Sequence, residues 1–322
     1  MMEGMQKRML LLLPMLSATL LWGEAAAAQR VERQAFAVQP GCTVRLDAYR
    51  GAIQVEAGTD DTVQVRVTVD YVTESYAQAE AVLSGFQLAA VTAGNEIRLL
   101  ARNPKDRGTR LTWDKSERPR VVYHLTVPTH CNLDLQTPDG GITVAPLRGE
   151  MRARGELGTI FFRQVDGSIE AATSTGNIIV SRCTGTVNLK SVQGDVRIGT
   201  VGGLASLRTV DGDIEVQTAY AAVDAATANG DVTAGFAKLA DPSRIKTSLG
   251  SIRATVNPSA AFSLQAAASF GKVLAKVDVA AVKGGNGRSK LRGNYQGGGP
   301  LLDLKASSGN VVIEAGEPLF AL

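Results

Sequence analysis

Residues 176–216 read GNIIVSRCTGTVNLKSVQGDVRIGTVGGLASLRTVDGDIEV, and glycine returns in this stretch every nine residues. The same step extends to both sides, and the glycines that share it are Gly140, Gly149, Gly158, Gly167, Gly176, Gly185, Gly194, Gly203, Gly212 and Gly230. The last interval is doubled, and Ala221 occupies the missing place. A fixed step of this kind indicates an internal structural repeat.

Apolar residues keep fixed places after these glycines. Two positions after every second glycine stand Ile142, Ile160, Ile178, Val196, Ile214 and Val232, and two positions further stand Val144, Phe162, Val180, Ile198, Val216 and Ala234. The position between them is mixed and includes Thr143, Arg197 and Glu215. The glycines in between are followed by a similar pattern. Such alternation is typical of a β-strand with one buried face.

One strand and one turn account for nine residues, so two such units form one coil of about 18 residues. Successive coils then stack in parallel, ~4.8 Å apart, with like residues in columns. A hexapeptide left-handed helix has coils of the same length, but its apolar residues would recur every six positions. The sequence therefore predicts an all-β protein with a parallel, roll-like β-solenoid of two strands per coil. Each glycine supplies a positive φ or a close backbone approach at a corner.

Residues 1–28 have the three-part pattern of a signal peptide. Lys7 and Arg8 precede an uncharged run at 9–22, and four alanines follow at 25–28. The run is shorter than the roughly 20 apolar residues that a membrane-spanning helix needs. We therefore expect cleavage near Ala28 and export of a chain without a transmembrane span to the periplasm or the cell surface. An uncleaved membrane anchor is the alternative.

The composition suits an exported repeat protein. The chain has 34 glycines and 5% aromatic residues, which favours a repeat over a compact globule. The formal net charge is only +3, which by itself argues neither for nor against a nucleic-acid partner. Because export argues against such a partner, we expect none.

Residues 29–130 are expected to form an N-terminal β segment with one short helix, continuous with a repeat domain at 131–322. Residues 40–55 (PGCTVRLDAYRGAIQV) align without a gap with residues 129–144 (THCNLDLQTPDGGITV), which indicates a modified part of the same solenoid. Residues 75–84 have the capping spacing and apolar pattern of a helix, which we expect to cover an open sheet edge.

The glycine step lengthens beyond residue 234, which predicts coils with longer corners. Apolar residues still follow Gly250, Gly271 and Gly309 in the pattern of the repeat. The widest insertion, Lys283–Pro300, holds seven glycines and is expected to be an exposed, mobile loop.

A short unit, G-[DNS]-[IV]-x-[VIA], recurs at 176–180, 194–198, 212–216 and 230–234, with G-x-I-x-V at 51–55 and SGNVVI at 308–313. In this array the chain resembles a bacterial family of secreted β-strand-repeat proteins that is catalogued as a domain of unknown function and labelled "putative adhesin". The resemblance covers most of the mature chain. It implies no catalytic residues, so no site can be carried over from the family.

The chain has three cysteines. Cys183 falls in an apolar column with Leu147, Val165 and Val201 at the eighteen-residue step, which favours a buried thiol. Cys42 and Cys131 occupy equivalent places in the two aligned segments. If these segments are adjacent coils, the Cα separation of about 4.8 Å suits a disulfide. Two unpaired buried thiols are the alternative.

The column directly after the corner glycines contains Asn177, Asp195, Asp213 and Asp231. Calcium-binding nonapeptide rolls need G-G-x-G-x-D-x-U-x, which no unit here matches. Asn and Asp at tight corners form hydrogen bonds within their own turns, and we favour this interpretation. A polysaccharide lyase would have to use these carboxylates with Arg197. The sequence therefore predicts no catalytic residue, no cofactor and no metal site.

Two loops combine cations with an aromatic ring, which suits contact with a glycan or another anionic polymer. The candidate contact residues are Arg107, Arg110 and Trp113 in residues 103–120, and Arg288, Arg292 and Tyr295 in residues 283–300. A solvated loop without a ligand is the alternative. We expect an exported, non-enzymatic, adhesin-like protein that binds an envelope glycan or an envelope protein. A polysaccharide-acting enzyme and a structural envelope spacer are the alternatives.

Overall fold

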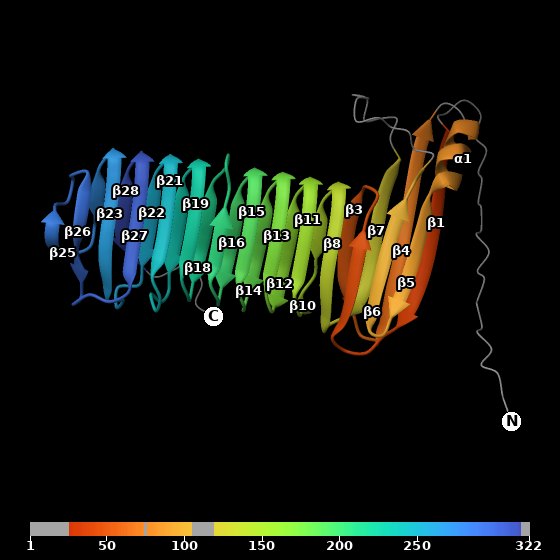
Figure 1. The fold of residues 1–322 in the computed structure, drawn as a ribbon, viewed down its shortest axis with the longest axis horizontal. Helices are drawn as coiled ribbons and strands as arrows, with labels where there is room; N and C mark the ends of the chain where they lie inside the picture. Colours follow the sequence, from red (N-terminus) through yellow and green to blue (C-terminus); the bar gives the residue numbers. More distant parts are fainter. Residues whose placement is uncertain (1–25, 74–75, 105–118, 317–322) are drawn as a thin grey trace.

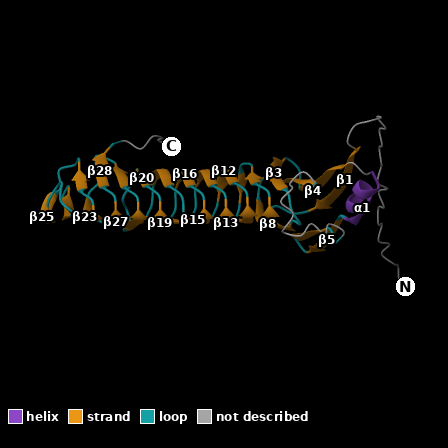
Figure 2. Cartoon of the chain, turned by 90° about the horizontal axis from the view of Figure 1, so that it is seen from above, coloured by secondary structure: helices purple, strands orange, loops and turns teal. Residues whose placement is uncertain are grey.

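A computed structural model describes residues 26–73, 76–104 and 119–316, and its strands form two 14-stranded sheets that face each other (Figures 1 and 2). In spatial order, sheet A contains β1 (Ala26–Ala37), β4 (Thr62–Thr73), β7 (Arg120–Pro128), β3 (Ala52–Gly58), β9 (Ile142–Val144), β12 (Ile160–Asp166), β14 (Ile178–Cys183), β16 (Val196–Val201), β18 (Ile214–Ala219), β20 (Val232–Phe236), β22 (Ile252–Val256), β28 (Val311–Ala315) and β24 (Val273–Ala275), with β10 (Leu147–Arg148) beside β12. Sheet B contains β25 (Ala280–Gly284), β26 (Lys290–Tyr295), β23 (Phe262–Phe270), β27 (Leu301–Ser308), β21 (Ser243–Leu249), β19 (Val223–Asn229), β17 (Ala205–Arg208), β15 (Val187–Gln193), β13 (Ile169–Thr175), β11 (Met151–Leu157), β8 (Cys131–Asp139), β2 (Cys42–Asp47), β6 (Glu96–Arg102) and β5 (Gln87–Ala93).

The apolar columns of the repeat form the core between the two sheets. Ile160, Ile178 and Val196 pair in register on neighbouring parallel strands, and each is fully buried. The residue between two apolar positions points outward, so Arg197 lies on the outer surface of sheet A. The predicted all-β solenoid, with two strands in each coil of the regular array, is confirmed.

Glycine is more uniform at the corner before the strands of sheet A than at the corner before the strands of sheet B in the regular array. Gly212, before a strand of sheet A, has φ +151°, and a Cβ there would lie 2.2 Å from the carbonyl oxygen of Gly194 in the preceding coil. Before strands of sheet B, Gly149 and Gly167 have φ +136° and +153°, but Gly185 and Gly203 lack a positive φ. At Gly185 and Gly203 the close approach of the backbone is the restriction. This is the corner at which Ala221 replaces glycine.

The last part of the chain does not stack in sequence order. β27 lies between β21 and β23, and β28 lies between β22 and β24, so residues 301–315 form a coil inserted before the coil of 262–275. The prediction of a mobile loop at Lys283–Pro300 is wrong, because this segment contributes to a β-hairpin. β26 pairs antiparallel with β23, and β25 pairs with β26. Leu291 of β26 is buried, so this hairpin belongs to the folded end of sheet B.

The other end of the solenoid is built from antiparallel strands and one helix. β4 pairs antiparallel with β1 and β7, and β5 pairs antiparallel with β6. The predicted helix is present as α1 (Tyr76–Gly85), packed against β1 and β4. Ala79 and Leu83 are buried, and Arg30 Nη1 donates a hydrogen bond to the carbonyl oxygen of Leu83 at 2.8 Å. No helix in the described ranges is long and apolar enough to cross a membrane.

The two aligned sequence segments lie side by side. β2 pairs with β8 so that Val44 lies opposite Leu133, and β3 pairs with β9 so that Ile53 lies opposite Ile142. The signal-peptide prediction rests mainly on residues 1–25, outside the described residues. Residues 26–28 already belong to β1.

Candidate functional site

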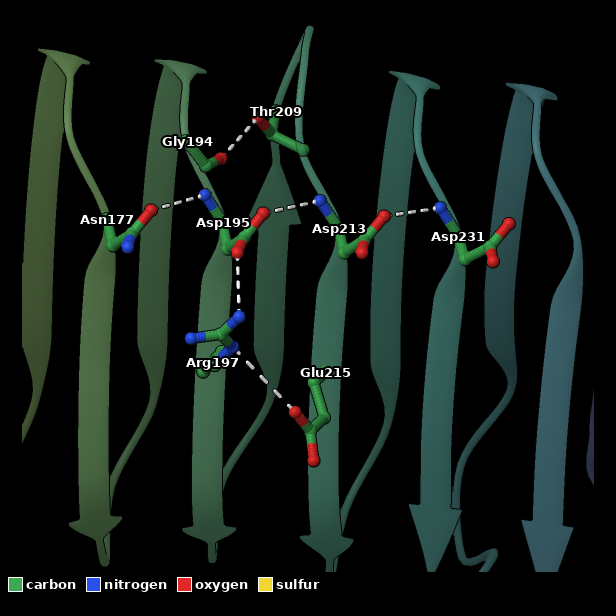
Figure 3. A network of polar contacts seen from close by, with 8 residues as sticks. All are labelled: Asn177, Gly194, Asp195, Arg197, Thr209, Asp213, Glu215 and Asp231. Atoms are coloured by element: carbon green, nitrogen blue, oxygen red, sulfur yellow. Dashed lines mark hydrogen bonds and ion pairs between the residues drawn. The ribbon is translucent and has the colours of Figure 1, made fainter.

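The Asn/Asp column after the corner glycines forms a ladder of hydrogen bonds between coils (Figure 3). Oδ1 of Asn177 accepts the backbone N–H of Asp195 at 2.9 Å, and Oδ1 of Asp195 accepts that of Asp213 at 3.0 Å. Asp213 accepts from Asp231 at 2.8 Å, and Asp231 accepts from Ser251 at 2.7 Å. Hydrogen bonds within each turn were expected, but these side chains bond to the next coil instead. The backbone N–H of the equivalent residue in the next coil points at each Asn or Asp side chain.

Other polar groups of this corner are also engaged. Thr209 Oγ1 donates to the carbonyl oxygen of Gly194 at 3.0 Å, on the inner side of the corner. Arg197 Nη2 lies 2.8 Å from Oδ2 of Asp195, and its Nε lies 3.9 Å from Oε2 of Glu215. Within the described residues, no group of three or more His, Cys, Asp or Glu could hold a metal ion. The ladder therefore links successive coils and supports the fold.

The two histidines do not converge on a site. His124 is half-buried on the outer surface of β7, whereas His130 is exposed just before β8. His130 lines a shallow depression together with Arg148 and Asp166. Thr184 Oγ1 and Arg148 Nε donate to Asp166 at 2.8 and 2.9 Å, and these bonds hold the pKa of that carboxyl below its ordinary value. Asp166 is thus ionised and suited to an ion pair rather than to proton transfer.

Cys42 and Cys131 are directly paired across β2 and β8, and their Sγ atoms lie 3.1 Å apart. Both are fully buried thiols in this structure. The hydrogen bond with Cys42 and burial raise the pKa of Cys131, while the same bond lowers the pKa of Cys42. Cys183 is also buried, 3.1 Å from the carbonyl oxygen of Gly167, and burial raises its pKa to about 11.

The candidate contact residues of the second loop lie on the hairpin β25–β26. Arg292 points outward from β26, opposite Gln265 of β23. Tyr295 packs its ring against Phe262, with centroids 5.2 Å apart, and donates its hydroxyl hydrogen to the carbonyl oxygen of Pro258 at 3.1 Å. Tyr295 is therefore an anchor of the hairpin. Arg288 lies in the turn at the opposite end of β26.

The first predicted loop lies largely outside the described residues. Arg107, Arg110 and Trp113 all fall within 105–118, so their arrangement relative to the hairpin stays a prediction.

A row of cations on the outer surface of sheet B was not expected from the sequence. Its members, in spatial order, are Arg154 on β11, Lys190 on β15, Arg208 on β17, Lys246 on β21, Lys305 on β27 and Lys290 on β26. We call these six residues the basic row. The strands in between contribute Ala172, Ala226 and Ala267, so no carboxylate interrupts it. The sequence feature that could have predicted this row is the fifth position after Gly149, Gly185 and Gly203, where Arg, Lys and Arg stand.

Three solved structures show similarity to this chain. A protein of Bacteroides fragilis described as a putative adhesin is 17% identical over 89% of this chain and 97% of its own, with a TM-score of 0.44. A putative cell adhesion protein of Clostridium sporogenes is 10% identical over 89% and 100% of the two chains, with a TM-score of 0.22. A putative lipid binding protein of Parabacteroides distasonis is 14% identical over 89% and 96%, with a TM-score of 0.42.

No curated protein sequence matches this chain. Residues 47–314, most of the sequence, match the family described as Toastrack DUF4097. Repeating corners, parallel stacked strands and this match agree with one another. The chain therefore belongs to the Toastrack DUF4097 family.

Proposed function

We propose that this protein is an exported, non-enzymatic binding protein of the cell envelope, with an adhesin-like role. The observation that carries the proposal is the corner ladder, in which the carboxylates of Asp195 and Asp213 accept backbone hydrogen bonds. The repeat thus uses its acidic side chains for stacking. Its flat outer surfaces then remain for contact with a partner, as is common in solenoid proteins.

The polysaccharide-acting enzyme is disfavoured by the same geometry. Most glycoside hydrolases need two carboxylates that flank one bond. The depression beside His130 contains one carboxylate, Asp166, and a second depression on β14, β16 and β18 also contains one, Glu215. Each of these carboxylates lies next to an arginine, Arg148 or Arg197. Neither depression therefore contains the pair of carboxylates, one as general acid and one as base or nucleophile, that glycoside hydrolysis needs.

Export to the periplasm or the cell surface is part of the proposal and rests on the signal-peptide pattern at 1–28. The partner we propose is an envelope glycan or an envelope protein. Electrostatic attraction to an anionic partner contributes to binding, because cations line the outer surface of sheet B. The corner carboxylates lie away from this surface, where Asp195 is paired with Arg197.

Co-sedimentation with envelope fractions of the producing bacterium tests this function. The chain from Gln29 onward should pellet with the envelope, and binding should weaken as salt rises, because the Debye length falls from ~10 Å at 0.1 M to ~3 Å at 1 M. Asp213→Asn keeps an acceptor oxygen in the ladder and should bind like the native protein.

Two results would contradict the proposal. Absence of sedimentation at every salt concentration would favour a structural spacer. Release of reducing or unsaturated sugars from envelope polysaccharides, lost in Asp195→Ala or Asp213→Ala, would establish the enzyme instead.

A further inference from the structure

The outer surface of sheet B presents three parallel rows of side chains, because each parallel strand of the array contributes one outward residue to each row. The basic row is the middle one. With strands ~4.8 Å apart, the nine strands from β11 to β26 extend over about 38 Å. Along this distance two cations alternate with one alanine: Ala172 precedes Lys190 and Arg208, and Ala226 precedes Lys246 and Lys305.

The basic row opposes the stability of the sheet. Lys190 lies directly opposite Arg208, and Lys246 lies directly opposite Lys305. Like charges at directly opposite positions of neighbouring strands are destabilising. Stacking needs only small or neutral side chains at these outward places, as Ala172 demonstrates. The cations of the basic row therefore do not contribute to the stability of the fold, and their presence indicates another role.

Half of the row is not neutralised by the protein itself. Arg154, Arg208 and Lys305 each have a carboxylate partner, at 4.0, 2.6 and 2.9 Å. Lys190, Lys246 and Lys290 are exposed and form no ion pair with any residue of the described ranges.

The two flanking rows differ from each other. The row on one side is mixed in charge and includes Glu170 and Asp224. The row on the other side, beyond Glu156, is uncharged and consists of Ser174, Val192, Val210, Ala228, Ser248, Ser307 and Ser269. Val192 and Val210 expose about half of their surface, 51% and 45%.

We propose that this surface binds a linear acidic polysaccharide that lies across the strands, along the axis of the solenoid. This inference rests on the proposed envelope-binding function and names the ligand class. The carboxylates of a polyuronate would face the basic row, and the apolar faces of its sugar rings would cover Val192 and Val210. A pyranose unit in an extended chain covers about the spacing of one strand, so its charges keep step with the row. Individually weak ion pairs add up along one polymer.

The rows favour such a polymer over two other polyanions. A flat anionic bilayer would meet Glu170 and Asp224 of the mixed row together with the cations, whereas a single polymer chain follows the basic row alone. Single-stranded nucleic acid is held by stacking on aromatic side chains, and none of the three rows contains an aromatic residue along the described strands β11 to β26.

The test uses the full mature chain and oligogalacturonates of defined length, with affinity measured by isothermal titration calorimetry. The triple variant Lys190→Gln, Lys246→Gln, Lys290→Gln removes the three unpaired cations. A matched control is Arg163→Gln, Arg182→Gln, Lys238→Gln, which removes the same charge from exposed positions away from sheet B's outer surface. Circular dichroism and thermal unfolding of both variants verify that the fold is retained.

The expected results are specific to the row. The row variant should bind at least about tenfold more weakly than the native protein, and the control should change affinity by less than about twofold. Affinity for the native protein should rise with oligomer length up to about nine sugar units, the length of the row at one unit per strand. Neutral dextran should not bind.

Several outcomes would overturn the inference. These are an equal loss in the two variants, an affinity independent of oligomer length, or equal binding of phosphatidylglycerol vesicles or oligo-dT with the same dependence on the row. Sedimentation with envelope fractions but no binding of oligogalacturonate would refute the ligand class and leave the proposed function standing. Absence of both would refute the function itself.

Discussion

A methyl group at a corner glycine gives the most direct test of how the coils stack. In Gly212→Ala the new Cβ would lie 2.2 Å from the carbonyl oxygen of Gly194, a distance that real Cβ atoms do not adopt. The backbone must therefore move by about 1 Å, or the corner must leave φ +151°. Either movement disturbs the bond from Thr209 to Gly194 and the ladder bond to the N–H of Asp213.

The expected cost is the sum of two contributions. Holding a non-glycine residue in a sparsely populated φ region costs about 1–3 kcal/mol, and the weakening of these two hydrogen bonds costs about 1 kcal/mol more in total. We expect Gly212→Ala to lower the free energy of unfolding by about 2–4 kcal/mol, measured by urea titration of circular dichroism.

Gly94→Ala is the matched control for this substitution. Gly94 also has a positive φ, +59°, but nothing lies within 4 Å of its added Cβ. Its cost should be limited to the ~1–2 kcal/mol of left-handed backbone conformation. Equal costs for the two substitutions would refute the claim that close approach between coils requires glycine at this corner.

Two further predictions concern the thiols and one carboxylate. Oxidation of the purified protein with oxidised glutathione should join Cys42 to Cys131, whose sulfurs already lie 3.1 Å apart, and non-reducing peptide mapping should find Cys183 still reduced; a bridge to Cys183 would contradict the register. Hydrogen bonds from Lys276 and Arg253 lower the pKa of Glu314, so its stabilising contribution is present above its ordinary pKa of 4.5 and is lost as the pH falls through the lowered value. Urea unfolding of Glu314→Gln should therefore show a loss of stability at pH 7 that disappears at low pH, and an equal loss at both pH values would refute the assignment.

The core was predictable because strand periodicity is local. A two-residue alternation repeated at a fixed step fixes which side chains face inward, and Ile178 and Ile214 indeed lie in one buried column. The order of the last coils was not predictable on these grounds. The patterns after Gly250, Gly271 and Gly309 fit equally well beside one another, so only long-range contacts decide which coil is the neighbour.

The candidate site was predicted less well, for two physical reasons. Hydrogen bonds within each turn were expected for the Asn/Asp column, because a turn rule considers only the residue's own neighbours, but Asp195 bonds to the next coil. The basic row lies on outward positions that leave no apolar signal. It becomes visible when the fifth position after each corner glycine is compared across coils, as at Lys190 and Arg208.

The insertion of the last coil also determines the composition of the basic row. β27 separates β21 from β23, so Lys305 lies beside Lys246, and Ala267 follows as the next alanine. In sequence order, Ala267 would lie beside Lys246 instead. The antiparallel strand β26 then adds Lys290 in register with Ala267, although it lies outside the parallel repeat. β27 and β26, which both break the repeat, thus extend the basic row. The like-charged pair of Lys246 and Lys305 is unfavourable for the sheet. A longer row of cations is what binding of a long anionic ligand requires.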